Sequence, residues 1–348
     1  MRVQRPGTAL SLRWPTRRSG RAIFALLILT LLPVILESCA WQTHTEPAPP
    51  ATVGGSTLNK DGPRPSSPIR AAFYYQWFPE GWRQAGTFPY TIYTPTAGLY
   101  DSGSAATIAA QVMSMRYGNI DAAIVSWWGP NQKSEQVRVP ALLAGAAWVD
   151  QNFRIALYYE KEGNGDPTVD EIKGDLGYIT REYAGQPNYL RIDGRPVIFV
   201  YDANDGNCAV VDRWRAANVD DAFYLDLKVV PGYSHCAFQP DGWHQYAPAA
   251  ATSDVSDLST ASGAFSISPG FAPAPDSSGS GIARPFLGRD TNRWIQEIRS
   301  MVASGTRWQL ITTFNEWGEG TAVESADQWA TTSGQGAYLD ALHTVDRT

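Results

Sequence analysis

Two glutamates near the carboxyl end of the chain, Glu316 and Glu319, have the type and spacing that acid–base chemistry requires. Residues three apart share one face of a helical turn, so the two carboxylates lie close together. Like charges at short range raise one pKa, which leaves one proton donor and one proton acceptor near neutral pH. Cleavage of a glycosidic bond uses such a pair. The spacing alone also fits an acidic loop at a helix N-terminus. However, Trp317 with Gly318 and Gly320 favours a functional rim, where glycine allows close backbone approach.

Aromatic and acidic residues also occur at the ends of the other short apolar runs of the sequence. Almost no lysine or arginine accompanies them. Such a rim suits a neutral, polyhydroxylated ligand, because flat rings stack on sugars and carboxylates accept hydrogen bonds from hydroxyl groups. Aromatic residues at strand ends can alternatively belong to the core. We expect the following residues to bind substrate: Tyr75, Trp77, Trp127, Trp128, Glu160, Tyr201, Asp202, Tyr246, Arg284, Trp317 and Glu324.

Several of these assignments leave an alternative open. Trp127 and Trp128 alternate across a strand, so one faces the rim and the other faces the helices; we expect Trp127 at the rim. Glu160 either accepts a sugar hydroxyl or forms an ion pair with an arginine. Glu324 is expected to orient a neighbouring group rather than to react. Arg284 either binds substrate or holds a carboxylate in place.

The elements that must position these residues alternate between strands and helices. Buried strands are expected at residues 70–77, 122–128, 153–159, 196–201, 222–227, 242–246, 263–268 and 307–314. Amphipathic helices are expected at residues 105–117, 139–151, 169–183 and 290–303. Eight alternating strands indicate a (β/α)8 TIM barrel in the α/β class, with functional groups at the carboxyl ends of the strands. An open doubly wound sheet is the alternative, but no G-x-G-x-x-G follows the first strand. The Ser/Gly/Pro-rich stretch 247–281 is expected to be an insertion that helps to wall the site.

The first 68 residues have the composition of a targeting segment and a tether. Three arginines between residues 17 and 21 precede the apolar run 22–36, which fits a secretory signal and is short for a membrane span. Leu36-Glu37-Ser38-Cys39 resembles a bacterial lipobox and predicts a lipid on Cys39; simple secretion and an uncleaved anchor are the alternatives. The next segment, rich in Pro, Gly, Ser and Thr, indicates a disordered or extended linker. We therefore expect a signal peptide at 1–39, a linker at 40–68 and one catalytic domain at 69–348.

Charge and composition exclude some classes of partner. The chain of 348 residues has a formal net charge of −6, but residues 1–36 hold six arginines and no acid. The remainder has 22 bases against 34 acids, which argues against nucleic acid as a partner because a polyanion requires a basic face. Hydrophobic residues make up 43% and charged residues 18%, the balance of a folded domain.

The cysteines and histidines indicate export and give no sign of a metal. With Cys39 lipidated, Cys208 and Cys236 remain; they form either a disulfide in an oxidising compartment or two buried thiols. No histidine has metal-ligand spacing, and in segment 202–207 the glycine comes one position too early for a calcium loop. We expect no metal, no cofactor and a monomer. The expected location is the cell surface or periplasm, through a lipid anchor in the membrane, with secretion as the alternative.

The residues from Phe314 to Thr321, with Glu324, resemble the signature of glycoside hydrolase family 99, the endo-α-mannosidase family. At two positions the chain departs from that pattern: Gly318 stands where the mannosidases carry histidine, and His244 where they usually carry tyrosine. Specificity for mannan therefore does not follow. The resemblance covers about residues 70–345 and continues in order through Phe73-Tyr74-Tyr75, Ile120-Asp121, Ser126-Trp127-Trp128-Gly129-Pro130, Glu160, Asn188-Tyr189-Leu190-Arg191, Gly194-Arg195-Pro196-Val197, Tyr201-Asp202, Asp241-Gly242, Pro269-Gly270-Phe271 and Arg284-Pro285.

The resemblance implies a (β/α)8 hydrolase that acts inside an α-linked glycan with net retention. It implies that Glu316 deprotonates the sugar 2-hydroxyl, which attacks the anomeric carbon. Glu319 would then protonate the leaving oxygen and later activate water. A covalent glycosyl–enzyme route is the alternative. A glycan-binding lipoprotein without activity and a polysaccharide-assembly protein are rival functions. The presence of both glutamates favours the enzyme, and the chain shows no phosphate loop for a nucleotide sugar.

Overall fold

The computed structural model describes residues 67–345, apart from residues 85, 133, 202–205, 256–261 and 276–284. These residues all lie within one of the two units into which the chain divides, Ser56–Thr348. The expected signal peptide, almost all of the linker and Cys39 lie outside the described residues, as do Asp202 and Arg284.

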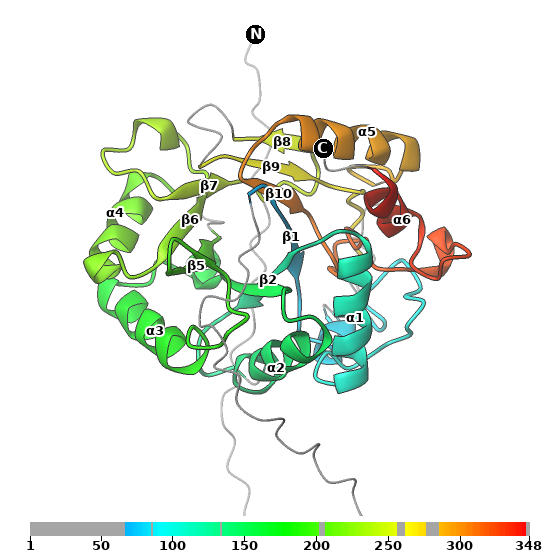
Figure 1. Cartoon of the computed structure of the whole chain (residues 1–348), viewed down its shortest axis with the longest axis horizontal. Helices are drawn as coiled ribbons and strands as arrows, with labels where there is room; N and C mark the ends of the chain where they lie inside the picture. The colour runs from blue at the N-terminus through cyan, green and yellow to red at the C-terminus, as the bar shows by residue number, and fades with distance from the viewer. Residues whose placement is uncertain are drawn as a thin grey trace, which may run out of the picture. The chain divides into compact units, whose positions relative to one another are not determined.

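Parallel strands form a curled sheet at the centre of this unit (Figure 1). Their order is β7-β6-β5-β3-β2-β1-β10-β9. Where the two ends of this order approach each other, the backbone N–H of Trp243 donates to the carbonyl oxygen of Ser262 at 3.3 Å. The result is a mixed α/β fold resembling a TIM barrel. The parallel strands are β1 (Ile69–Tyr74), β2 (Ala122–Trp127), β3 (Arg154–Tyr159), β5 (Arg195–Val200), β6 (Tyr224–Lys228), β7 (Gly242–His244), β9 (Ala264–Ile267) and β10 (Trp308–Ile311).

Helices cover the outside of the curled sheet (Figure 1). They are α1 (Ala105–Tyr117), α2 (Val139–Val149), α3 (Val169–Glu182), α4 (Cys208–Ala217), α5 (Thr291–Ala303) and α6 (Ala337–Thr344). Short helical turns lie at Glu80–Trp82, Ser134–Arg138, Lys161–Asn164, Val219–Asp221, Tyr233–His235 and Asp327–Trp329. In the described part of the chain, no helix combines the length and apolar character that a bilayer crossing requires.

The stretch 247–281 is not a single insertion, so that expectation is wrong in its extent. It contains the barrel strand β9, whose four residues are all buried, and the short strand β8 (Thr252–Asp254), which pairs with β9 antiparallel. A second short strand, β4 (Arg191–Ile192), pairs with β5 in the same antiparallel way. Beyond β9, the backbone N–H groups of Ala272 and Ala274 donate to the carbonyl oxygens of Glu319 and Gly318.

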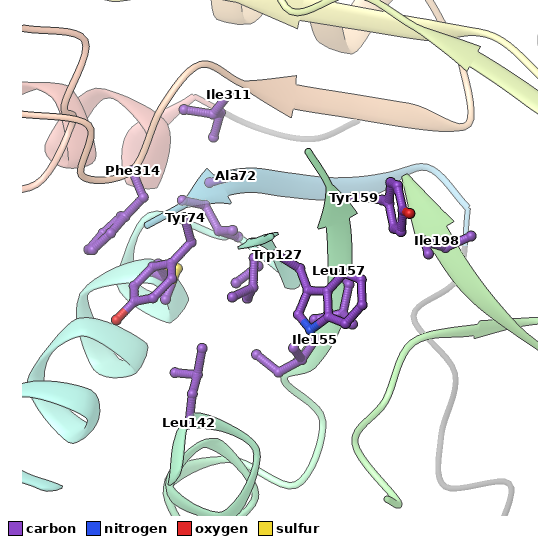
Figure 2. Packing of buried hydrophobic residues seen from close by; sticks show 14 of the residues in the cluster. Ala72, Tyr74, Trp127, Leu142, Ile155, Leu157, Tyr159, Ile198, Ile311 and Phe314 are labelled. Atoms are coloured by element: carbon purple, nitrogen blue, oxygen red, sulfur yellow. The ribbon is translucent and has the colours of Figure 1, made fainter. Parts of the chain in front are cut away.

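Alternate strand residues face opposite sides of the sheet and build two cores. In β1, Phe73 and its alternating neighbours pack inside the curled sheet, whereas Ala72 and Tyr74 pack between the sheet and the helices. Figure 2 shows this outer layer, with Trp127 and Leu157 among its members. Each fully buried large apolar side chain stabilises the fold by about 1.5–3 kcal/mol.

A disulfide links Cys208, at the start of α4, to Cys236, just after the turn Tyr233–His235. The bond ties the segment that follows β5 to the segment that follows β6, and it closes a sequence separation of 28 residues.

Replacing both cysteines, as Cys208→Ser/Cys236→Ser, should lower the free energy of unfolding by about 3–4 kcal/mol, because the cross-link restricts the unfolded chain. Urea unfolding curves measure this change, and Cys39→Ser is the matched control that leaves the bond intact. Labelling of Cys208 or Cys236 by a thiol reagent in the denatured, unreduced protein would contradict the bond.

Candidate active site

The segment of residues 312–324, here called the glutamate loop, follows β10 and folds back on itself. The N–H of Glu316 donates to Oγ1 of Thr313 at 2.8 Å. The N–H of Gly320 donates to the carbonyl of Trp317 at 3.1 Å, and that of Thr321 to the carbonyl of Glu316 at 3.2 Å. These turns place Glu316 and Glu319 at the carboxyl end of the strand, where barrels of this type carry their functional groups.

Asn315 joins the glutamate loop to the end of β1. Its Oδ1 accepts from the N–H of Tyr75 at 2.8 Å, and its Nδ2 donates to the carbonyl of Tyr75 at 2.9 Å. These two hydrogen bonds satisfy the backbone N–H and the carbonyl oxygen of Tyr75 with one buried amide side chain. It fixes the Tyr75 ring beside the paired glutamates.

A chain of hydroxyl groups ends on Glu319. The hydroxyl of Tyr75 donates to that of Tyr246 at 3.1 Å, and the hydroxyl of Tyr246 donates to Oε2 of Glu319 at 2.6 Å. Burial raises the pKa of Glu319 to about 7, although the bond from Tyr246 lowers it. Glu319 keeps part of its surface exposed.

Glu316 lies deeper than Glu319, and only 6% of its surface is exposed. Its Oε1 accepts from the N–H of Gly318 at 3.1 Å, whereas its Oε2 is buried without a hydrogen-bond partner among the described residues. Burial raises the pKa of Glu316 well above its ordinary value, and the charges of Glu319 and Glu160 raise it further. The two glutamates titrate together, so the proton that they retain belongs to the pair.

Glu160 follows β3 and is the third carboxylate of the site. It is buried, and its Oε1 has no partner in the described part of the chain. Burial raises its pKa well above the ordinary value, and the charge of Glu319 adds to this effect. No arginine or lysine is among the groups that shift the pKa of Glu160, Glu316 or Glu319. Among the described residues, these three carboxylates are therefore not paired with a cation.

Two predicted aromatic contacts are wrong. The Trp127 indole is wholly buried against Tyr159, at 5.5 Å between ring centroids, and against Tyr178 at 6.4 Å. Its parity along β2 is that of Val125, which packs outward, and Figure 2 shows Trp127 in that outer layer. Trp317 is also wholly buried, and its Nε1 donates to the hydroxyl of Tyr100 at 3.0 Å. Neither ring is available to a ligand.

The other predicted aromatic residues lie near the strand ends. Trp77 packs on Tyr75 with ring centroids 4.6 Å apart, and its Nε1 is buried without a partner in the described chain. Tyr201 packs on Tyr246 at 5.8 Å. Trp128 is half-buried, and its parity places it on the inner side of β2, opposite to Trp127.

Glu324 lies beneath the glutamate loop and is satisfied by the protein. Its Oε2 accepts from the hydroxyl of Tyr100 and its Oε1 from Nε2 of Gln111, both at 2.8 Å. Burial raises the pKa of Glu324 to about 7. Because Tyr100 also accepts the indole N–H of Trp317, Glu324 orients this ring and does not face substrate.

Tyr90 is a site residue that the sequence did not single out. A Cβ on Gly318 would lie 2.7 Å from Cε1 of Tyr90 and 3.0 Å from Oε1 of Glu316, so the ring occupies the space of a side chain at position 318. Gly318, the first of the two residues that depart from the family pattern, therefore packs against Tyr90. His244 is the second of these residues. Its Nδ1 lies 2.8 Å from Oδ1 of Asp226, and its Nε2 lies 3.2 Å from the hydroxyl of Tyr158. Tyr90 is not at a strand end, which explains why spacing did not reveal it.

Within the described ranges, no group of three or more His, Cys, Asp or Glu side chains is arranged to hold a metal ion.

The fold and the site define an α/β protein resembling a TIM barrel, with a cluster of carboxylates at the strand ends. Residues 78–217 match the model of glycosyl hydrolase family 99. This match supports a glycoside hydrolase and confirms the resemblance of the chain to family 99. The matched segment includes Glu160 and ends before Glu316 and Glu319.

Solved structures share the fold. A family 99 endo-α-mannosidase from Bacteroides thetaiotaomicron, in complex with bis-tris-propane, is 20% identical, with a TM-score of 0.60 over 79% of this chain and 94% of that chain. A structure described as a glycoside hydrolase-like protein is 15% identical, with a TM-score of 0.53 over 79% of this chain and 93% of that chain. No match was found among curated protein sequences.

Replacing Tyr246 by phenylalanine removes the hydroxyl that stabilises the charged form of Glu319. The pKa of Glu319 should then rise above its value of about 7. A hydrogen bond to a charged group is worth about 1.5–3 kcal/mol, which corresponds to a rise of about one to two pH units. Carbon-13 NMR titration of the glutamate carboxyls measures this shift, with Glu319→Gln as the assignment spectrum.

Tyr117→Phe is the matched control, because the hydroxyl of Tyr117 donates to Asp340 on the outside of the barrel. It should leave the titration of Glu319 unchanged. A Tyr246→Phe protein whose Glu319 titrates as in the parent would show that the bond does not set this pKa.

Proposed function

We propose that this protein is an exported glycoside hydrolase that cleaves O-glycosidic bonds within an α-linked glycan, with net retention. The observation that carries the proposal is the group of three carboxylates, Glu160, Glu316 and Glu319, at the strand ends, none of them paired with a cation in the described part of the chain. Buried acids with raised pKa values in a barrel rim are typical of acid–base catalysis. The match of residues 78–217 to family 99 supports the same class of enzyme.

Glu319 is proposed as the general acid and base. Its Oε2 accepts from Tyr246, which leaves Oε1 to carry the proton. In the first step this proton passes to the glycosidic oxygen as the bond from that oxygen to the anomeric carbon breaks. In the second step the Glu319 carboxylate takes a proton from water, and the water oxygen bonds to the anomeric carbon. The bond that this carbon formed in the first step, to the sugar 2-oxygen or to Glu316, breaks at the same time, and a released 2-oxygen takes its proton back from Glu316.

Glu316 is proposed as the partner that supports the charge developing at the anomeric carbon. Its Oε2 is buried and has no partner in the described chain, so it is the oxygen positioned to accept a proton or to bond with the sugar. In one route it takes the proton of the 2-hydroxyl, whose oxygen then closes onto the anomeric carbon. In the other it bonds to that carbon itself. Both routes give retention, and trapping of a covalent intermediate separates them.

The sugar contacts are proposed to come from Tyr75, Trp77, Trp128, Glu160 and Tyr201. Their rings and the Glu160 carboxylate belong to the strand ends that surround the paired glutamates. Asp202 and Arg284 stay in the proposal on sequence alone. Because Glu160, Glu316 and Glu319 are all acids, a neutral glycan fits the described part of the site better than an acidic one.

Glu316→Gln and Glu319→Gln keep the side-chain shape and remove the ionisable group. Each should lower kcat by about 10²–10⁴-fold, because this is the usual contribution of general acid–base catalysis. An aryl glycoside with a good leaving group needs little protonation, so it should partly restore the first step in Glu319→Gln and not in Glu316→Gln. Stopped-flow release of the aryl group from a panel of α-linked aryl glycosides measures this difference.

Glu182→Gln on the outside of α3 is the matched control and should keep full activity, since the exposed Glu182 pairs only with Arg181 among the described residues. Near-full turnover in both site variants would refute the assignment. A wild-type protein that binds α-glucans or α-mannans and cleaves none of them would instead indicate a glycan-binding lipoprotein.

We also propose that the protein is anchored by a lipid on Cys39 and acts at the cell surface or in the periplasm. The order of basic run, apolar run and lipobox-like residues supports this. Intact mass of the mature membrane-bound protein should show a modified cysteine at its N-terminus, and Cys39→Ala should release the protein. Mature protein that starts elsewhere without modification would contradict the anchor.

A further inference from the structure

Arg289 lies behind the glutamate loop and binds its backbone. Its Nη2 donates to the carbonyl oxygen of Gly320 at 2.8 Å and to that of Ala322 at 2.7 Å. These carbonyl groups belong to the first and the third residue after Glu319. Arg289 itself immediately precedes Asp290, whose side chain caps the start of α5. One guanidinium therefore connects the loop to the helix layer.

Three aromatic rings surround this guanidinium. Its Cζ lies 4.0 Å from the ring centroid of Trp329, 4.7 Å from that of Tyr338 and 4.8 Å from that of Tyr93. We call Arg289 with these three residues the arginine cluster. The cluster takes one residue from the segment between β1 and α1, one from the turn Asp327–Trp329 and one from α6.

Arg289 forms no ion pair with a carboxylate in the described part of the chain, because Asp290 next to it in sequence is turned to the start of α5. Burial lowers the pKa of its guanidinium, and no carboxylate is among the groups that shift this pKa. Nε and Nη1 are buried and make no hydrogen bond in the described part of the chain. A guanidinium cannot shed its proton to escape such a site, so the rings, the hydroxyl groups of Tyr338 and Tyr93 and the carbonyl dipoles must stabilise it. A charge kept under these conditions indicates a role other than an ordinary ion pair.

The arginine cluster touches the loop beside both glutamates. Gly320 has a φ of +66°, and a Cβ there would lie 2.6 Å from the carbonyl oxygen of Ala272 and 3.2 Å from the Tyr93 ring. The Trp329 ring stacks on Trp317, which follows Glu316, at 6.2 Å between centroids. The loop is therefore packed tightly between the arginine cluster on one side and Ala272 on the other, with no room for a side chain at position 320.

We infer that Arg289 is a positioning residue for Glu319 and, through Trp329 and Trp317, for Glu316. This inference rests on the proposed function of the two glutamates and deepens it. Arg289 touches no substrate. It fixes the backbone that carries the acid–base pair, and small displacements of such a pair are expensive because proton transfer requires hydrogen-bond distance.

The test replaces Arg289 by methionine and, separately, by lysine. Methionine keeps the stem and its contact with the rings but loses both donors to the loop; lysine keeps the charge and one donor group. A cavity of about 410 Å³ adjoins Arg289, Trp329 and Tyr338, so alanine would admit water and is avoided. Arg299→Met, on the exposed side of α5, is the matched control.

Two measurements are made on the full chain. Amide hydrogen exchange of a peptide that spans residues 316–324 should be faster in Arg289→Met than in the parent, and unchanged in Arg299→Met. With an α-linked aryl glycoside that the parent cleaves, kcat should fall by about 10²-fold while KM stays nearly constant, as expected for a displaced catalytic group. Arg289→Lys should lie between the parent and Arg289→Met.

The exchange measurement does not depend on activity. If the parent cleaves no glycoside, the proposed function fails while exchange still reports on the loop. Exchange that matches the parent in Arg289→Met overturns the inference, as does a loss confined to melting temperature with kcat unchanged.

Discussion

The constraint on which the rest of this structure depends is the burial of carboxylates at the strand ends, where no described residue supplies a cation to pair with them. Glu160 and Glu316 are buried, which raises the pKa of both, and the charge of Glu319 raises both further because like charges repel strongly where water is scarce. Such a group is held only if the surrounding backbone is rigid, since repulsion would otherwise separate the acids. The double hydrogen bond of Asn315 to Tyr75 and the internal bonds of the glutamate loop provide this rigidity.

The glutamate loop lies between ionisable groups of opposite kind, the carboxyl groups that it carries and the guanidinium of Arg289. On its inner side are the acids, which relieve repulsion by keeping protons. On its outer side is Arg289, which keeps its charge and is stabilised by three rings and two carbonyl oxygens. The tight contacts at Gly318 and Gly320 follow from this arrangement, because Tyr90 presses on the first and Ala272 on the second. Glycine is therefore a packing requirement of the loop as well as a conformational one.

The sequence predicted the strands and four of the helices because buried apolar runs and a 3.6-residue period are local signals. Helices α4 and α6 were missed, since they are short: 10 and 8 residues. Trp127 and Trp128 show the limit of local reasoning. Alternation says that they point in opposite directions, and only the packing of Val125 against the helices decides which one faces outward. Tyr90 and Arg289 reach the glutamate loop from segments without strand-end signals, so tertiary contacts alone reveal them.

The buried carboxyl groups and Arg289 also differ in their response to pH. Burial raises the pKa of Glu319 and of Glu324 to about 7, above the ordinary value of about 4.3 in an unfolded chain. The folded protein therefore holds more protons between these values, and the stability that it gains is complete below the lower one. This stability is lost as the pH rises through about 7. Arg289 does not titrate in this range, so its hold on Gly320 and Ala322 is constant. The loop thus keeps its geometry while the acids that it carries change their protonation.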